Sequence, residues 1–166
     1  MREALRRLEQ EHVVELSSKG ILVLGVTDKD IRDIYAVRLR VEGMAAAAAA
    51  QRTDAPEAKE LLEAIELQEY YVGRRDADHI KFMDSRFHEL VYRMRGRGVL
   101  YNTLLPLHKK VQKFRKASVQ NESRADSSLR EHREIYQAIM SGDAAAADAA
   151  MTAHVKNAME HIVKKG

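Results

Sequence analysis

The sequence predicts an all-α protein: an antiparallel bundle of about six helices, preceded by a helix and a β-hairpin. Two prolines and eight glycines in 166 residues leave long stretches of good helix formers. After Thr27, apolar residues recur at helical rather than alternating spacing in almost every segment. Short breaks separate these segments, and helices joined by short connections pack as antiparallel neighbours in a bundle.

Composition limits the class of protein. Hydrophobic residues make up 45% of the chain and charged residues 32%, which argues for a globular protein and against disorder. No apolar stretch approaches the roughly 20 residues that a membrane helix needs, and Met1 is followed directly by charged residues. The absence of cysteine fits a reducing compartment and excludes thiol catalysis. We therefore expect a cytoplasmic protein with no membrane partner, in which His, Asp or Glu would hold any metal.

The first 26 residues predict a helix followed by a β-hairpin. The segment "REALRRLEQEH" has the pattern of a charged amphipathic helix, with Leu5 and Leu8 on one side. The segment "VVELSSKGILVLGV" contains two short β-branched runs separated by "SSKG". Because an isolated two-stranded hairpin is only marginally stable in water, we expect this fragment to be the end of a larger unit.

The bundle helices follow from a cap and from breaks in the helical pattern. Thr27 followed by Asp30 predicts a capping box that starts a helix running to about Arg52. The segments "TDAPEA", "GRRDAD", "RGRG" and "SGD" then interrupt the pattern. They predict a helix ending near Tyr71, a helix carrying Ile80 to Met94, and helices over about 99–118, from near Glu122 to "SGD", and over about 143–164.

Three predicted helices each carry a histidine on their apolar face. Asp84 and His88 lie one turn apart, so their side chains project to the same side and can share one ion. His132 and His154 lie on the apolar faces of the last two helices. One inward histidine is most simply explained by a hydrogen bond in the core. Three with an aspartate would cost about 1 to 3 kcal/mol each if buried without partners, whereas one divalent ion satisfies all four.

Three imidazoles and one carboxylate without thiolate suit Zn²⁺ or Ni²⁺, with Mn²⁺ or Fe²⁺ as alternatives. Such a set leaves coordination positions open to water or to a ligand carboxylate. Glu89 and Glu131 adjoin predicted ligands in sequence but are expected to point away from them. Four histidines are left out of the set because they lie at helix ends, in a basic segment or near the C-terminus: His12, His79, His108 and His161.

Arg38 falls in the middle of the apolar face of the first long helix, where a cation needs a partner. Glu42, four residues on, would supply one as an internal ion pair. The alternative is that the guanidinium of Arg38 binds a ligand carboxylate, for which its planar fork is suited. The sequence leaves both interpretations open.

Beyond these patterns, residues 1–26 resemble the second half of the winged helix-turn-helix of GntR-type bacterial repressors, with an Arg-Glu-Ala-Leu core in the recognition helix and a two-stranded wing. The rest of the chain resembles the all-helical ligand-binding (FCD) domain of the FadR branch of that family. In many such domains an Asp-x-x-x-His pair and two later histidines hold a metal. The segments "DSRFH", "EHREIYQAI" and "MTAHVKNAM" match these motifs, which implies Asp84, His88, His132 and His154 as the ligands.

The resemblance implies two units, a partial winged helix-turn-helix over residues 1–26 and an FCD-like domain over residues 27–166. Met1 would then lie inside the recognition helix, with Arg2 and Arg6 near the DNA, although a solvated helix face would also explain these two arginines. The net charge of +3 permits DNA binding without requiring it. We expect a truncated or misassigned reading frame with weak or no sequence-specific DNA binding.

Two further positions bear on the resemblance to the family. His12 stands where a helix-ending glycine is usual, and Arg97 stands where an asparagine often contributes to the effector pocket. In contrast, "RLRVE" matches a segment whose arginine lines that pocket, which implies a ligand-binding role for Arg38. The departure at Arg97 weakens any transfer of ligand identity.

The function that these observations imply is a ligand-responsive bacterial transcriptional regulator rather than an enzyme. Its metal-centred bundle would bind a small carboxylate effector, and a homodimer of the intact protein would read operator DNA. The alternatives are a small metal-dependent hydrolase and a bundle that a metal only braces. The hydrolase has little support, because the sequence contains no His-Glu-x-x-His motif and no obvious general base beside the histidines.

Overall fold

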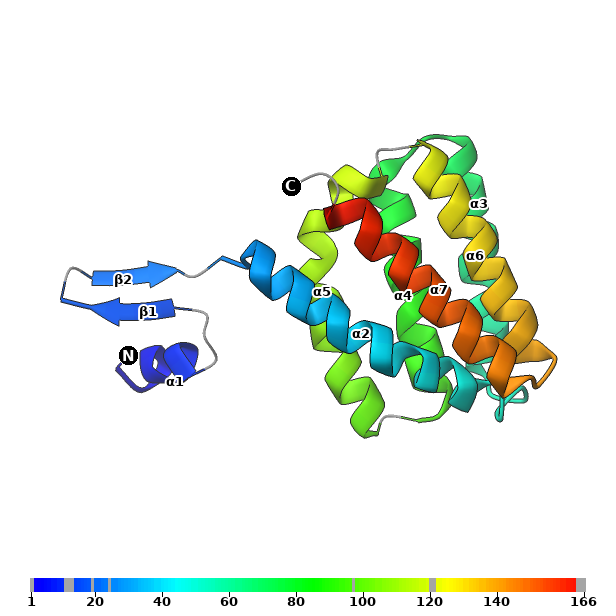
Figure 1. Cartoon of the computed structure of the whole chain (residues 1–166), viewed down its shortest axis with the longest axis horizontal. Coiled ribbons are helices and arrows are strands. Elements are labelled where there is room, and N and C mark those ends of the chain that lie inside the picture. Colours follow the sequence, from blue (N-terminus) through cyan, green and yellow to red (C-terminus); the bar gives the residue numbers. More distant parts are fainter. Residues whose placement is uncertain are drawn as a thin grey trace.

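The computed structural model describes residues 2–10, 14–18, 20–23, 25–96, 98–119 and 122–163 and confirms the all-α fold class (Figure 1). Six helices form the bundle, and a further helix with a two-stranded hairpin precedes them. Among the helices described, none is long and apolar enough to span a membrane. The elements are α1 (Arg2–Gln10), β1 (Val14–Ser17), β2 (Gly20–Val23), α2 (Asp28–Ala49), α3 (Glu57–Gly73), α4 (Ala77–Met94), α5 (Val99–Val119), α6 (Glu122–Met140) and α7 (Ala144–Val163).

The N-terminal helix and hairpin stand apart from the bundle at one end of the molecule (Figure 1). Strands β1 and β2 are antiparallel, from the pair Val14 and Val23 to the pair Ser17 and Gly20 at the turn. The backbone N–H of Leu16 donates to a carboxylate oxygen of Glu9 at 3.2 Å, which ties the hairpin to α1. The predicted helix-then-hairpin order is therefore confirmed.

A capping box starts α2, as predicted. The side chain of Thr27 accepts a hydrogen bond from the N–H of Asp30 at 3.1 Å, and the carboxylate of Asp30 accepts one from the N–H of Thr27 at 2.8 Å. The helix ends at Ala49, three residues before the predicted end at Arg52. The α-helix ends here because the chain enters a tighter turn of the 3₁₀ type, in which the N–H of Arg52 bonds the carbonyl of Ala49 at 2.9 Å.

Helix α4 packs against α2, α3 and α5, which explains why many of its side chains are buried. Its buried side chains recur at helical spacing and include Met83, Phe87, Leu90 and Val91. Asp76 caps its first turn by accepting a hydrogen bond from the N–H of His79 at 3.1 Å.

Helices α2 and α7 pack closely along their length (Figure 1). Both carry buried alanines, including Ala45 and Ala46 on α2 and Ala147 on α7. At Gly43, side chains of α7 lie against the backbone of α2, because a Cβ atom there would lie 2.7 Å from Thr152 Oγ1 and closer still to Asp148 Oδ1. The small residues therefore let the two helices approach closely.

Replacing Gly43 with alanine is expected to destabilise the protein by about 1 to 2 kcal/mol, since overpacking outweighs the better helix propensity of alanine. Urea unfolding of the variant beside the parent protein measures this difference. Gly73→Ala is the matched control, because a Cβ at that helical glycine would meet nothing within 4 Å. Equal stability of the two variants would mean that Asp148 and Thr152 move aside at little cost, and would contradict the expected overpacking at Gly43.

Candidate metal centre

Four side chains from three helices converge in the interior of the bundle. Asp84 and His88 come from α4, His132 from α6 and His154 from α7. Each offers a ligand atom, and these four atoms lie within 4.8 Å of one another. Asp84 is 2% exposed and the three histidines are fully buried. The structure thus brings together all four residues of the predicted set.

The distances within this cluster suit a single ion. His88 Nε2 lies 3.1 Å from His154 Nε2, and His132 Nε2 lies 3.7 Å from Asp84 Oδ1. Metal–nitrogen bonds of about 2.1 Å place neighbouring ligand atoms roughly 3.0 to 3.4 Å apart in octahedral or tetrahedral geometry. One ion can therefore reach these atoms after only small adjustments of the side chains.

The outer nitrogen of each histidine faces an oxygen acceptor. The Nδ1 atoms of His88 and His154 lie 3.0 Å from Glu42 Oε2 and 2.7 Å from Glu131 Oε2. The Nδ1 atom of His132 lies 2.7 Å from Gln68 Oε1. These contacts favour the tautomer that carries its proton on Nδ1, which leaves the Nε2 lone pairs directed at the common centre.

This tautomer has a consequence for the 3.1 Å contact between His88 and His154. Two Nε2 lone pairs at that distance repel each other unless one nitrogen carries an extra proton or a cation lies between them. Burial lowers the pKa of His154 to about 4, and the neighbouring Glu131 only partly opposes this shift. A proton on His154 is therefore disfavoured, and a cation between the two nitrogens would remove the repulsion, which fits this donor set.

A second cluster adjoins the first and contains His108, a histidine outside the predicted set. His108 on α5 is 1% exposed, and its ring centroid lies 4.7 Å from that of His88. His108 is therefore buried beside the predicted set, although its place in a basic segment gave no sign of this. Leu104, His108 and Val111, all buried, show the helical spacing that places His108 on the inner face of α5.

Glu42, His88 and His108 also have ligand atoms within 4.8 Å of one another. The carboxylate of Glu42 is already engaged by Arg38. A divalent ion in this second set would lie beside the guanidinium and would be repelled by it. We therefore favour the set formed by Asp84, His88, His132 and His154.

Two side chains that hold the histidines were not predicted. Glu131 was expected to point away from the predicted ligands. Instead it contacts His154 on the neighbouring helix, while Glu89 lies on the outer side of α4 and contacts Arg86 at 4.0 Å. Gln68 is fully buried in α3, and no feature of its sequence neighbourhood distinguishes it.

Arg38 and Glu42 form an ion pair in which both side chains are fully buried, as one of the two interpretations predicted. Burial alone would lower the pKa of Arg38, but Glu42 raises it above the usual value, and Arg38 with His88 holds the pKa of Glu42 well below its usual range. The bond to Glu42 uses only Nε of Arg38. Within the described part of the chain, its Nη1 and Nη2 atoms have no hydrogen-bond partner.

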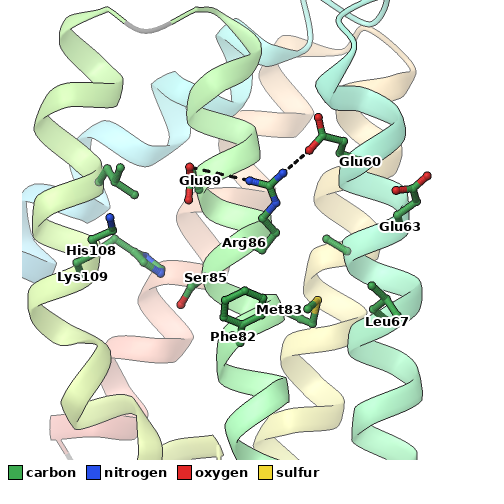
Figure 2. Close-up of a pocket in the computed structure, with 12 residues that line it drawn as sticks. Glu60, Glu63, Leu67, Phe82, Met83, Ser85, Arg86, Glu89, His108 and Lys109 are labelled. Atoms are coloured by element: carbon green, nitrogen blue, oxygen red, sulfur yellow. Dashed lines mark hydrogen bonds and ion pairs between the residues drawn. The ribbon is translucent and has the colours of Figure 1, made fainter.

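His108 also lines a groove on the outer side of the cluster (Figure 2). This groove has a volume of about 560 Å³ and lies between α3, α4 and α5. Arg86 pairs with Glu60 on α3 and with Glu89 on its own helix, and Phe82 and Met83 form an apolar part of the wall. His108 therefore separates the groove from the buried histidines.

The predicted DNA-contacting residues lie in α1. Arg6 is exposed there, and Arg2 is the first residue of the helix, although its side chain is outside the described part. Three further expectations concerned residues that lie outside the described part of the chain: Met1, His12 and Arg97. The structure leaves the roles proposed for these positions as predictions.

Comparisons with known proteins identify related chains. Residues 33–157 match the model of the family described as FCD domain. The gluconate operon transcriptional repressor of Bacillus subtilis is 32% identical over 110 residues, 64% of this chain and 45% of the repressor. An uncharacterized HTH-type transcriptional regulator of the same organism, YdhC, is 27% identical over 98% of this chain and 73% of its own length. The chain thus matches less than half the length of the gluconate repressor.

Solved structures show the same fold. Escherichia coli McbR/YncC superposes with a TM-score of 0.84 at 16% identity, covering 100% of this chain and 84% of the other. A Streptococcus agalactiae protein described as GntR has a TM-score of 0.69 at 22% identity, covering 96% of this chain and 80% of the other. The likeness extends over the bundle and the N-terminal helix and hairpin.

Proposed function

Because the chain belongs to the FCD domain family of GntR-type transcriptional regulators, we propose that its bundle holds a transition-metal ion and binds a small organic acid that controls DNA binding. The observation that carries the proposal is the convergence of three Nε2 atoms, each on a ring whose Nδ1 faces an oxygen. Asp84, His88, His132 and His154 would hold the ion. Zn²⁺ or Ni²⁺ suits this donor set best, with Mn²⁺ or Fe²⁺ as alternatives.

When bound, such an ion would supply positive charge and open coordination positions for a carboxylate. The chain itself would supply the second contact through Arg38, whose Nη1 and Nη2 atoms have no hydrogen-bond partner among the described residues. A buried guanidinium of this kind favours a planar anion, because Nη1 and Nη2 can both donate to one carboxylate. Both features support a carboxylate as the effector.

The N-terminal elements support a link to DNA. In the proposed division, residues 1–26 are part of a winged helix-turn-helix, with Arg2 and Arg6 near the DNA, and residues 27–166 are the effector domain. The regulator would act as a homodimer on paired half-sites in the cytoplasm. An effector could alter operator binding only to the extent that it binds one arrangement of the dimer better than another.

Two other functions remain to be distinguished from a sensor. The names of the relatives describe regulators, which supports a regulator over a metal-dependent hydrolase. A metal that only braces the bundle would stabilise it without making it responsive to acids. The distinction therefore depends on whether an acid binds at the metal.

A thermal-shift panel of small carboxylates, read with metal-loaded and metal-free protein, tests the proposal. Gluconate belongs in the panel because it occurs in the name of a relative. We expect at least one hydroxy acid to raise the unfolding temperature only when metal is bound, and Arg38→Met to reduce that rise. A metal-dependent increase in stability with no response to any acid would favour the brace instead.

A further inference from the structure

Of the three oxygen contacts that hold the metal-site histidines, one extends to the surface. Glu131 on α6 accepts a hydrogen bond from His154 Nδ1 at 2.7 Å. Its two oxygens also accept bonds from the fork of Arg124 at 2.8 and 2.9 Å, and Asn157 donates to it at 2.8 Å. Three side chains therefore fix this carboxylate in position.

The other two contacts differ from this one in charge and in burial. Gln68, which faces His132, is a neutral amide, and Glu42, which faces His88, is paired with the buried cation of Arg38. Both are fully buried, whereas the side chain of Glu131 is 15% exposed. Among the described residues that contact the Nδ1 atoms of the three rings, only Glu131 is both charged and partly exposed to solvent.

That surface is a polar hollow of about 300 Å³ between α6 and α7. The hollow is lined by Glu131, by the two surface residues that donate to it, Arg124 and Asn157, and by Ser123, Ser127, Glu160 and His161. A continuous chain of hydrogen bonds thus runs from the hollow through Arg124 and Glu131 to His154, while the four metal-binding side chains themselves are buried.

We infer that Glu131 is a positioning residue of the metal centre, which acts through His154 and is held in place from the surface by Arg124 and Asn157. The inference rests on the proposed metal site. A carboxylate on Nδ1–H fixes the tautomer and ring orientation of a ligand histidine and raises the basicity of its Nε2. Both oxygens of Glu131 accept hydrogen bonds from the guanidinium of Arg124, an arrangement typical of an ionised carboxylate.

Glu131→Gln tests this role because it removes the charge and keeps the size of the side chain. Competition with a chromophoric chelator at pH 7 measures the affinity of the full chain for Zn²⁺. We expect the substitution to weaken binding about 10- to 100-fold. Glu160→Gln is the matched control, since it removes a carboxylate from the same hollow at an exposed position, and it should change affinity by less than about twofold.

A second measurement does not depend on metal. The ¹⁵N chemical shifts of the histidine rings in metal-free protein report which nitrogen carries the proton. We expect His154 to carry it on Nδ1 in the parent protein. In Glu131→Gln this preference should be lost, because Arg124 and Asn157 both donate to Oε1 and leave the amide nitrogen facing His154.

The outcomes separate the two claims. A parent protein that binds no Zn²⁺ would overturn the metal site itself. A parent that binds Zn²⁺, with unchanged affinity and an unchanged His154 tautomer in Glu131→Gln, would overturn the positioning role of Glu131 and leave the metal site intact.

Discussion

Zn²⁺ is expected to raise the unfolding temperature of the protein by about 5 to 10 °C when its free concentration is about 100-fold above the dissociation constant. Binding at that excess adds roughly 2.7 kcal/mol to the free energy of unfolding. In a domain of this size, each kcal/mol shifts the midpoint by about 2 to 4 °C. Differential scanning calorimetry with and without the ion measures the shift, and Ni²⁺ should produce a comparable one.

The shift should disappear in the double variant His132→Ala, His154→Ala, because only Asp84 and His88 of the proposed set remain. His79→Ala is the control: it removes an exposed imidazole outside the cluster and should leave the Zn²⁺-dependent shift unchanged. If the double variant does not fold, Asp84→Asn removes one ligand charge with little change in size. A full Zn²⁺ shift in the variants of the proposed set would contradict the assignment of the ligands.

Arg38→Met is expected to reduce the free energy of unfolding by about 3 to 5 kcal/mol. The substitution leaves Glu42 buried and charged without its cation, and an uncompensated buried charge is strongly destabilising. Adding Glu42→Gln removes that charge while keeping an oxygen for His88, so the double variant should regain at least half of the loss. Urea unfolding of metal-free protein measures both differences.

Arg86→Met is the matched control for this pair. Arg86 also pairs with a glutamate, Glu60, but both side chains are about a third or more exposed. Its loss should therefore cost no more than about 1 kcal/mol. Equal effects at Arg38 and Arg86 would contradict the buried ion pair. A double variant at Arg38 and Glu42 that folds well and still responds fully to acids would instead contradict the proposed ligand contact.

The fold was predictable because its determinants are local in sequence. The capping box at Thr27, the helical period of the apolar residues and the breaks between segments set the order of the elements and most of their ends. The end of α2 was predicted three residues too late, since the tight turn at Ala49 depends on which carbonyls the chain reaches after the helix.

The site was only partly predictable. The spacing of Asp84 and His88 is a local signal, and the apolar faces of α6 and α7 placed His132 and His154 inward. The burial of His108 was missed because its neighbours Lys109 and Lys110 suggest an exposed segment, although His108 shares the helical spacing of the buried residues of α5. Gln68 and Glu131 were missed because each contacts a histidine on another helix, and the rotation that brings such pairs together is set by the packing of whole helices.

Elemental analysis of the purified protein, after removal of any affinity tag, tests the metal centre most directly. The parent protein and the double variant His132→Ala, His154→Ala would be measured side by side, each after reconstitution with Zn²⁺, Ni²⁺ or Mn²⁺ and removal of excess ion. About one equivalent of a transition metal in the parent, lost in the variant, is the expected result. No metal in the parent under any of these conditions would mean that the buried histidines are held by a shared proton, and would contradict the metal centre.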